Sequence, residues 1–379
     1  MRIGIDTLII LLFSFAIVIL FSLVVIIRLW VKSKSRLYIW FLLQIAFQIP
    51  AFFMFIRLFV VNFNTPRKNS ISIGIIGLLW ACSMMCMIIG ISKLSRQKDE
   101  QPDRKKEEYN PGFIKGLGML VFYTFICTLV PDLILFIASK FIGFAKDDPL
   151  VYVFTTLAGL GLLILWLKKK YIINFKSMVS IENISIIFLI PMTLTILGLQ
   201  ILLSEVGIFT ERIIPMNDFW IKAFNSMLGN GFATWKVILG VAVIAPITEE
   251  IVFRGMILKG FLKHYSVRKS IILSALLFGL AHMNPWQFVS AFAAGIILGW
   301  WYVKTGSIIT TIFGHALNNG MIFIIEAIGL SIPGYNAALS ASNHQPVWFD
   351  LLGAVLLAGG IVWLIKLFNE RQARATELV

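Results

Sequence analysis

Residues 241–258 read VAVIAPITEEIVFRGMIL, an apolar stretch of helix length that two adjacent glutamates and one arginine interrupt. A charged group at mid-bilayer costs at least about 2.5–3.5 kcal/mol, so ionisable residues in a membrane span are functional candidates. Glu250 and Arg254 are four residues apart with the carboxylate first, the favourable order for a helical ion pair. Glu249 is turned about 100° from that pair. The spacing predicts a locked Glu250 and a Glu249 that is free to exchange a proton.

The composition agrees with a membrane interpretation. The 379 residues are 59% apolar and 14% charged, with a mean hydropathy of +0.88. Soluble domains are nearer half apolar and a quarter charged, and this excess is too large for a water-soluble core. We therefore predict an all-α, polytopic membrane helical bundle, which excludes secreted, cytosolic and disordered classes.

The net charge of the chain is +14, and we assign it to basic residues in cytoplasmic loops. We expect no nucleic-acid partner, because no basic stretch is interleaved with aromatic residues.

Apolar runs of about 20 residues predict about eleven transmembrane helices. These runs are Leu8–Ile27, Leu37–Val61, Ile71–Ile91, Leu117–Ala138, Leu150–Leu167, Ile184–Leu203, Trp235–Leu258, Ser270–His282, Trp286–Val303, Ile308–Leu330 and Val347–Leu367. Lysines and arginines concentrate in the odd-numbered loops, which predicts a cell-membrane protein with the N-terminus outside and the C-terminus in the cytoplasm. Pro246 is expected to break the seventh helix, and the short eighth helix is expected to be tilted or partly re-entrant.

We divide the chain into four parts. Three leading spans occupy residues 1–94, and a charged cytoplasmic linker follows at 95–111. Intermediate membrane helices occupy 112–204. Residues 205–379 form a core whose motifs lie within 235–330, together with a C-terminal span. The three cysteines lie in apolar runs and are interpreted as packing residues, since they complete neither a disulfide framework nor a zinc site.

Two further helices carry paired candidate residues at a spacing of four. One contains Phe278 and His282, and the other contains His315 and Asn319. An imidazole and an amide on one helix face could stabilise a developing oxyanion, although interhelical hydrogen bonding alone would also explain them. Counted from the basic cytoplasmic ends, Glu249 and both histidines lie roughly 15–20 Å deep at 1.5 Å per residue. A common depth favours one hydrolytic or proton-handling site.

The three motifs Glu249-Glu250-x-x-x-Arg254, Phe278-x-x-x-His282 and His315-x-x-x-Asn319 resemble those of the CPBP intramembrane protease family. That family includes type II CAAX prenyl endopeptidases and proteins linked to bacteriocin immunity. The resemblance covers roughly Trp235–Leu330. It implies that Glu249 activates a water with help from His282 and that His315 and Asn319 stabilise the oxyanion. Glu250, Arg254 and Phe278 would keep the site in shape.

The resemblance leaves the cofactor and the substrate open. The family is often labelled as metalloproteases, and Glu249, His282 and His315 could hold a divalent metal such as zinc; a glutamate-activated water without metal is the alternative. The expected partners are the lipid bilayer and a membrane-associated peptide or protein, either prenylated or of the pheromone, leader or bacteriocin type. The main alternative function is a catalytically inactive scaffold that binds a partner protein or peptide. A proton-coupled transporter is disfavoured because the chain has no internal repeat.

Overall fold

The computed structural model describes residues 26, 39, 41–49, 86, 108–128, 131, 149–182, 184–216, 221, 235–335 and 344–377. The chain separates into two compact units, residues 1–105 and 106–379, and the boundary falls within the predicted linker. In the first unit, residues 41–49 are helical. Most of the three leading spans lies outside the described residues, so the predicted count of eleven spans stays a prediction.

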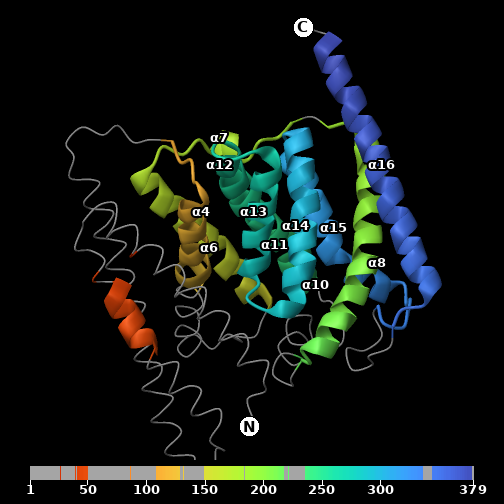
Figure 1. The fold of residues 1–379 in the computed structure, drawn as a ribbon, viewed down its shortest axis with the longest axis horizontal. Coiled ribbons are helices and arrows are strands. Elements are labelled where there is room, and N and C mark those ends of the chain that lie inside the picture. Colours follow the sequence, from red (N-terminus) through yellow and green to blue (C-terminus); the bar gives the residue numbers. More distant parts are fainter. Residues whose placement is uncertain are drawn as a thin grey trace, which may run out of the picture. The chain divides into compact units, whose positions relative to one another are not determined.

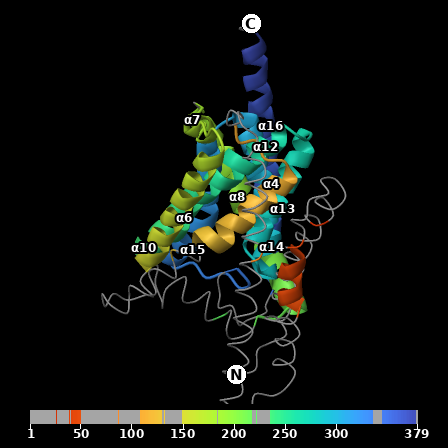
Figure 2. The same ribbon diagram turned by 90° about the vertical axis from the view of Figure 1, so that its left-hand side faces the viewer.

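The described residues of the second unit form helices joined by loops, with one isolated β-bridge between Glu108 and Ile172 and no strand (Figures 1 and 2). Its α-helices are α4 (Phe113–Phe122), α6 (Pro149–Lys170), α7 (Phe175–Met178), α8 (Leu189–Ile213), α10 (Trp235–Ile238), α11 (Ala245–Glu250), α12 (Lys259–Leu262), α13 (Val267–Ala281), α14 (Pro285–Thr305), α15 (Ile308–Ala327) and α16 (Val347–Glu377). The π-helical segments are η2 (Tyr123–Thr128), η4 (Leu239–Ile244) and η5 (Ile251–Leu258), and η3 (Ile186–Phe188) is a 3₁₀ turn.

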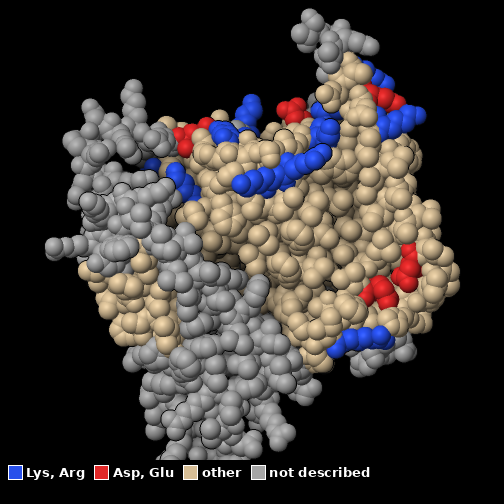
Figure 3. All heavy atoms as spheres, in the orientation of Figure 1, with Lys and Arg blue, Asp and Glu red and all other residues tan. Residues whose placement is uncertain are grey.

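Five of the described helices are long and apolar enough to cross a membrane. They are Pro149–Lys170, Ile186–Ile213, Pro285–Thr305, Ile308–Ala327 and Val347–Arg374. The prediction of an all-α membrane bundle is confirmed by them. Lysine and arginine side chains gather mainly at the end of this unit where α7, α12 and the C-terminal part of α16 lie (Figure 3).

The segment that carries the two glutamates is one unbroken helical run through Pro246, contrary to the expected break. It begins at Trp235 and continues through η4, α11, η5 and α12 to Leu262. Pro246 has no N–H to donate to the preceding turn, and the ladder before it widens, so that the Ala245 N–H donates to the Gly240 carbonyl five residues back. A π segment therefore absorbs the proline, and such segments are frequent at functional sites.

The eighth span is short, as its apolar run predicted, and its tilted or partly re-entrant character stays a prediction. Helix α13 has 15 residues and its C-cap is His282. Met283 then adopts a left-handed conformation, with φ of 52°, and α14 begins at Pro285 with Asn284 as its N-cap. The chain therefore reverses direction directly after His282, and this turn fixes where the imidazole lies.

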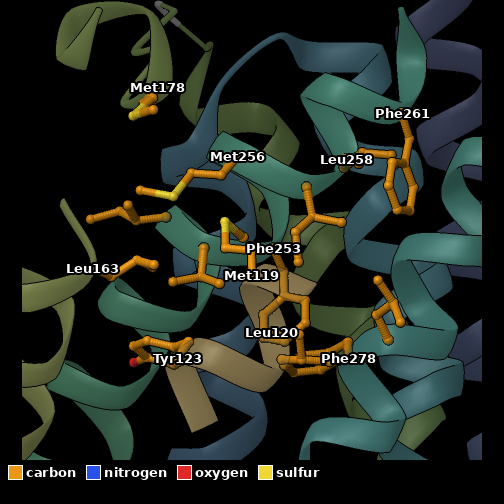
Figure 4. Packing of buried hydrophobic residues seen from close by; sticks show 14 of the residues in the cluster. Met119, Leu120, Tyr123, Leu163, Met178, Phe253, Met256, Leu258, Phe261 and Phe278 are labelled. Atoms are coloured by element: carbon orange, nitrogen blue, oxygen red, sulfur yellow. The ribbon is translucent and has the colours of Figure 1, made fainter. Parts of the chain in front are cut away.

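Helices that precede the motif region complete its core (Figure 4). Met119 and Tyr123 from α4 and η2, together with Leu163 from α6, pack in one cluster with Phe253 and Phe278. Helix α16 runs along α8, and α13 runs along α14. The motif helices are thus held from several sides, which the preorganisation of a site requires.

Candidate active site

A buried ion pair forms the foundation of the site. The Arg254 Nη1 donates to Glu250 Oε1 over 2.6 Å, and the two side chains are 1% and 0% exposed. Arg254 Nη2 also donates to the Gly295 carbonyl of α14 over 3.2 Å, and the guanidinium lies 4.8 Å from the centroid of the Phe278 ring. The ion pair predicted from spacing is confirmed. It ties α11 and η5 to α13 and α14.

The same carboxylate oxygen holds the imidazole of His315. His315 Nδ1 lies 2.8 Å from Glu250 Oε1, and His315 is 5% exposed. Because an ionised carboxylate only accepts hydrogen bonds, Nδ1 is the donor. This bond turns the other ring nitrogen, Nε2, toward Glu249, whose Oε2 lies 3.9 Å away. That separation is too long for a direct hydrogen bond and suits a bridging water.

The two glutamates lie in different environments. Glu250 is fully buried, whereas 26% of the Glu249 side chain is exposed. Their adjacent positions on the helix point the side chains in different directions, so that one carboxylate is enclosed by Arg254 and His315 and the other is partly exposed beside the imidazole. Glu250 is therefore locked, as the spacing predicts, and the proton exchange expected of Glu249 stays a prediction.

Phe278 lies against both imidazoles. The centroid of its ring is 5.2 Å from that of His282 and 5.5 Å from that of His315, each in an edge-to-face arrangement. His282 Nδ1 donates to the Phe278 carbonyl over 3.0 Å, which leaves Nε2 of His282 for other partners. The structure therefore gathers residues from the three sequence motifs around one aromatic ring.

Asn284 holds the turn that carries His282, and sequence reasoning missed it. Its Nδ2 donates to the His282 carbonyl over 2.9 Å, and its Oδ1 accepts from the Gln287 N–H over 2.8 Å. The signal was present as Asn284 followed by Pro285, since asparagine is a favoured N-cap and proline is favoured at the first helical position.

Asn319 lies one turn along α15 from His315. Its Nδ2 donates to the Val241 carbonyl of η4 over 3.0 Å, and its Oδ1 accepts from Asn318 Nδ2 over 3.2 Å. A primary amide has two donor hydrogens, so in the part of the chain that the structure describes one N–H of Asn319 remains after the bond to Val241. The expected pairing of an imidazole and an amide on one face is present in the helix, with each group held by a different partner.

The metal alternative does not fit this arrangement. In the part of the chain that the structure describes, no three side chains of His, Cys, Asp or Glu come together as the ligands of one metal ion. Nδ1 of each site histidine donates to a protein oxygen, in His282 to the Phe278 carbonyl and in His315 to Glu250, so Nε2 is the ring nitrogen left for coordination. A site at Glu249, His282 and His315 would require these side chains to be rearranged.

Comparison with known proteins points to the same segment. The family model described as "Type II CAAX prenyl endopeptidase Rce1-like" matches residues 231–321. The chain is 24% identical over 141 residues to "Putative membrane peptidase YdiL" of Bacillus subtilis (strain 168), a match that covers 34% of this chain and 58% of that protein. It is 30% identical over 120 residues to "UPF0177 protein YbdI" of Lactococcus lactis subsp. lactis (strain IL1403), covering 31% of this chain and 65% of that protein. No solved structure matches the chain significantly.

Proposed function

Because this chain belongs to the CPBP intramembrane protease family, we propose that it is an intramembrane endopeptidase that hydrolyses a peptide bond with a water activated by Glu249. The observation that carries the proposal is the contact of Glu250 with both Arg254 and His315, which leaves Nε2 of His315 3.9 Å from an accessible Glu249 carboxylate. A general base beside an oriented imidazole is an arrangement typical of hydrolysis.

The reaction uses the residues in distinct roles. Glu249 takes a proton from the water while the water oxygen forms a bond to the scissile carbonyl carbon. Nε2 of His282 helps to hold this water. We assign stabilisation of the oxyanion of the tetrahedral intermediate to the remaining N–H of Asn319 and to His315, whose ring Glu250 orients. Glu249 then delivers its proton to the leaving amine nitrogen as the C–N bond breaks.

We assign the substrate to membrane-associated peptides or proteins. The proposed site lies roughly 15–20 Å from the basic helix ends at 1.5 Å per residue, near the middle of a hydrocarbon core about 30 Å thick, and we propose that the scissile bond enters the bilayer from the side of these ends. With the C-terminus in the cytoplasm and the N-terminus outside, as the charge distribution predicts, the substrate enters from the cytoplasm of the cell. A prenylated C-terminal peptide suits a site that is reached through lipid.

The test is cleavage by the full-length protein in proteoliposomes. The probe is an internally quenched peptide with a farnesylated C-terminal CAAX-type motif, compared with the same peptide without the prenyl group. Glu249→Gln keeps the side-chain shape and removes the base, so we expect cleavage to fall about 10²–10⁴-fold. The matched control is Glu326→Gln, the same change at an exposed carboxylate of α15, which should cleave normally.

Undiminished cleavage by the Glu249→Gln protein would refute the proposal. If neither peptide is cleaved, a comparison of membrane proteomes from cells with wild-type protein and with Glu249→Gln identifies natural substrates. Identical proteomes, with a cellular phenotype that survives the substitution, would favour a scaffold that binds a partner protein or peptide, as in bacteriocin immunity.

A further inference from the structure

Gln200 is a polar residue near the middle of the apolar segment Ile186–Ile213, outside the part of the chain that the family model covers. Its Nε2 donates to the backbone carbonyl of Asn318 in α15. Its Oε1 accepts from the hydroxyl of Tyr335 over 3.1 Å. A polar side chain at membrane depth is costly unless it is bonded, and here both ends of the amide have partners. Gln200 therefore fixes α15 to α8 at Asn318.

The side chain of Asn318 continues this chain of hydrogen bonds toward the proposed site. It donates through Nδ2 to Asn319 Oδ1 over 3.2 Å, and Asn319 Nδ2 donates to the Val241 carbonyl over 3.0 Å. If the Asn319 amide were flipped, its N–H groups would face the Nδ2 donor of Asn318, and its oxygen would face the carbonyl oxygen of Val241. Both contacts would be repulsive. The two bonds thus fix the orientation of the amide and leave one N–H for a ligand.

We propose that Asn318 and Gln200 are positioning residues that hold the Asn319 amide with its remaining N–H available to the oxyanion. Asn318 acts through its side-chain bond to Asn319, and Gln200 acts by fixing the Asn318 backbone. The inference rests on the proposed peptidase activity. It brings α8, which lies before the matched segment, into the construction of the oxyanion site. The competing explanation is that these amides only hold the helices together, so the test must measure more than folding.

The decisive experiment is a double-mutant cycle in proteoliposomes with the quenched farnesylated peptide. Asn318→Leu removes the donor to Asn319, and we expect kcat to fall about 10–100-fold with little change in KM, because a misplaced group lowers the rate of the chemical step more than binding. If Asn318 acts through Asn319, the pair Asn318→Leu and Asn319→Ala should be no slower than Asn319→Ala alone. Losses that multiply in the double variant would overturn the proposal.

Gln200→Leu tests the second link and should also lower kcat. Thr193→Val is its control on α8 and should leave kcat unchanged, because the bond of Thr193 Oγ1 among the described residues lies within its own helix, to the Leu189 carbonyl over 2.8 Å. If the Gln200→Leu protein does not fold, Asn318→Leu still decides the proposal, since Asn318 is only half-buried.

The two proposals fail in different ways. Cleavage that survives Glu249→Gln removes the proposed function and with it the role of Asn319. Cleavage that depends on Glu249 but is insensitive to Asn318→Leu, or that changes only in KM, removes the positioning role alone.

Discussion

Replacement of Arg254 by methionine is expected to be the most destabilising single change near the site. The arginine is 1% exposed and its partner Glu250 is fully buried, with 2.6 Å between the bonded atoms. Removing one member of a buried pair leaves the other charge uncompensated, at a cost of about 3–5 kcal/mol. The lost contact of the guanidinium with the Phe278 ring, now at 4.8 Å, adds to this by about 0.5–2 kcal/mol. Methionine is unbranched and flexible, so it fills much of the vacated space.

A second variant separates charge from packing. In Glu250→Gln combined with Arg254→Met, no charge is left buried, and we expect most of the lost stability to return, because neutral replacements of buried pairs are often tolerated. Cleavage should stay low in this double variant. His315 then faces a neutral amide in place of the carboxylate that accepts from its Nδ1 over 2.8 Å, and the orientation of its ring is no longer fixed.

The assays are reversible unfolding in mixed detergent micelles and cleavage in proteoliposomes. We expect wild type to be the most stable, Arg254→Met the least stable, and the double variant close to wild type. An Arg254→Met protein whose unfolding free energy lies within about 1 kcal/mol of wild type would refute this expectation, because loss of the counter-ion of a buried carboxylate costs more than that. A double variant as unstable as Arg254→Met would assign the loss to packing.

Two further predictions concern helix packing and the surface of the second unit. A methyl group added at Gly198 would lie 2.5 Å from the Gly353 carbonyl oxygen. Gly198→Ala should therefore separate α8 from α16 and lower the free energy of unfolding by about 1–3 kcal/mol. Gly207→Ala is the control on the same helix and should leave the free energy of unfolding unchanged, because a methyl group there has no described neighbour within 4 Å. At the surface, the hydrogen bond from Lys263 lowers the pKa of Glu108 below its usual 4.5. This pair therefore stabilises the fold above pH 4.5, and its contribution to stability disappears as the pH falls through the lowered pKa. Both partners are more than 40% exposed, so Glu108→Gln should change the melting temperature only slightly at pH 7 and low salt, and not at all at high salt or well below the lowered pKa.

Local spacing predicted what lies within one helix. The pair of Glu250 and Arg254 followed from a separation of four residues, and the different exposure of Glu249 followed from the helical rotation between neighbours. The short α13 followed from the length of its apolar run. These predictions succeeded because a single helix has fixed geometry that the sequence alone specifies.

The contacts between helices could not be predicted in the same way. Glu250 and His315 are 65 residues apart in sequence, and their 2.8 Å contact depends on how α11 and α15 pack. The bond from Gln200 to the Asn318 carbonyl also joins residues far apart in sequence and depends on how α8 and α15 pack. The helix break expected at Pro246 was wrong because π-helical bonding can absorb a proline without interrupting the run. Each of these outcomes depends on packing partners that no local pattern contains.

The pair of Glu250 and Arg254 supports both the packing of the helices and the geometry of the proposed site. Glu250 Oε1 accepts from Arg254 Nη1 and also interacts with His315 Nδ1. One oxygen atom therefore belongs to the ion pair that holds the helices and to the contact that orients the imidazole toward Glu249. Any change in the charge or position of this oxygen must affect both, because hydrogen bonds that share an atom polarise each other in a medium of low dielectric constant. The stability of the bundle and the geometry proposed for catalysis are thus coupled at a single carboxylate.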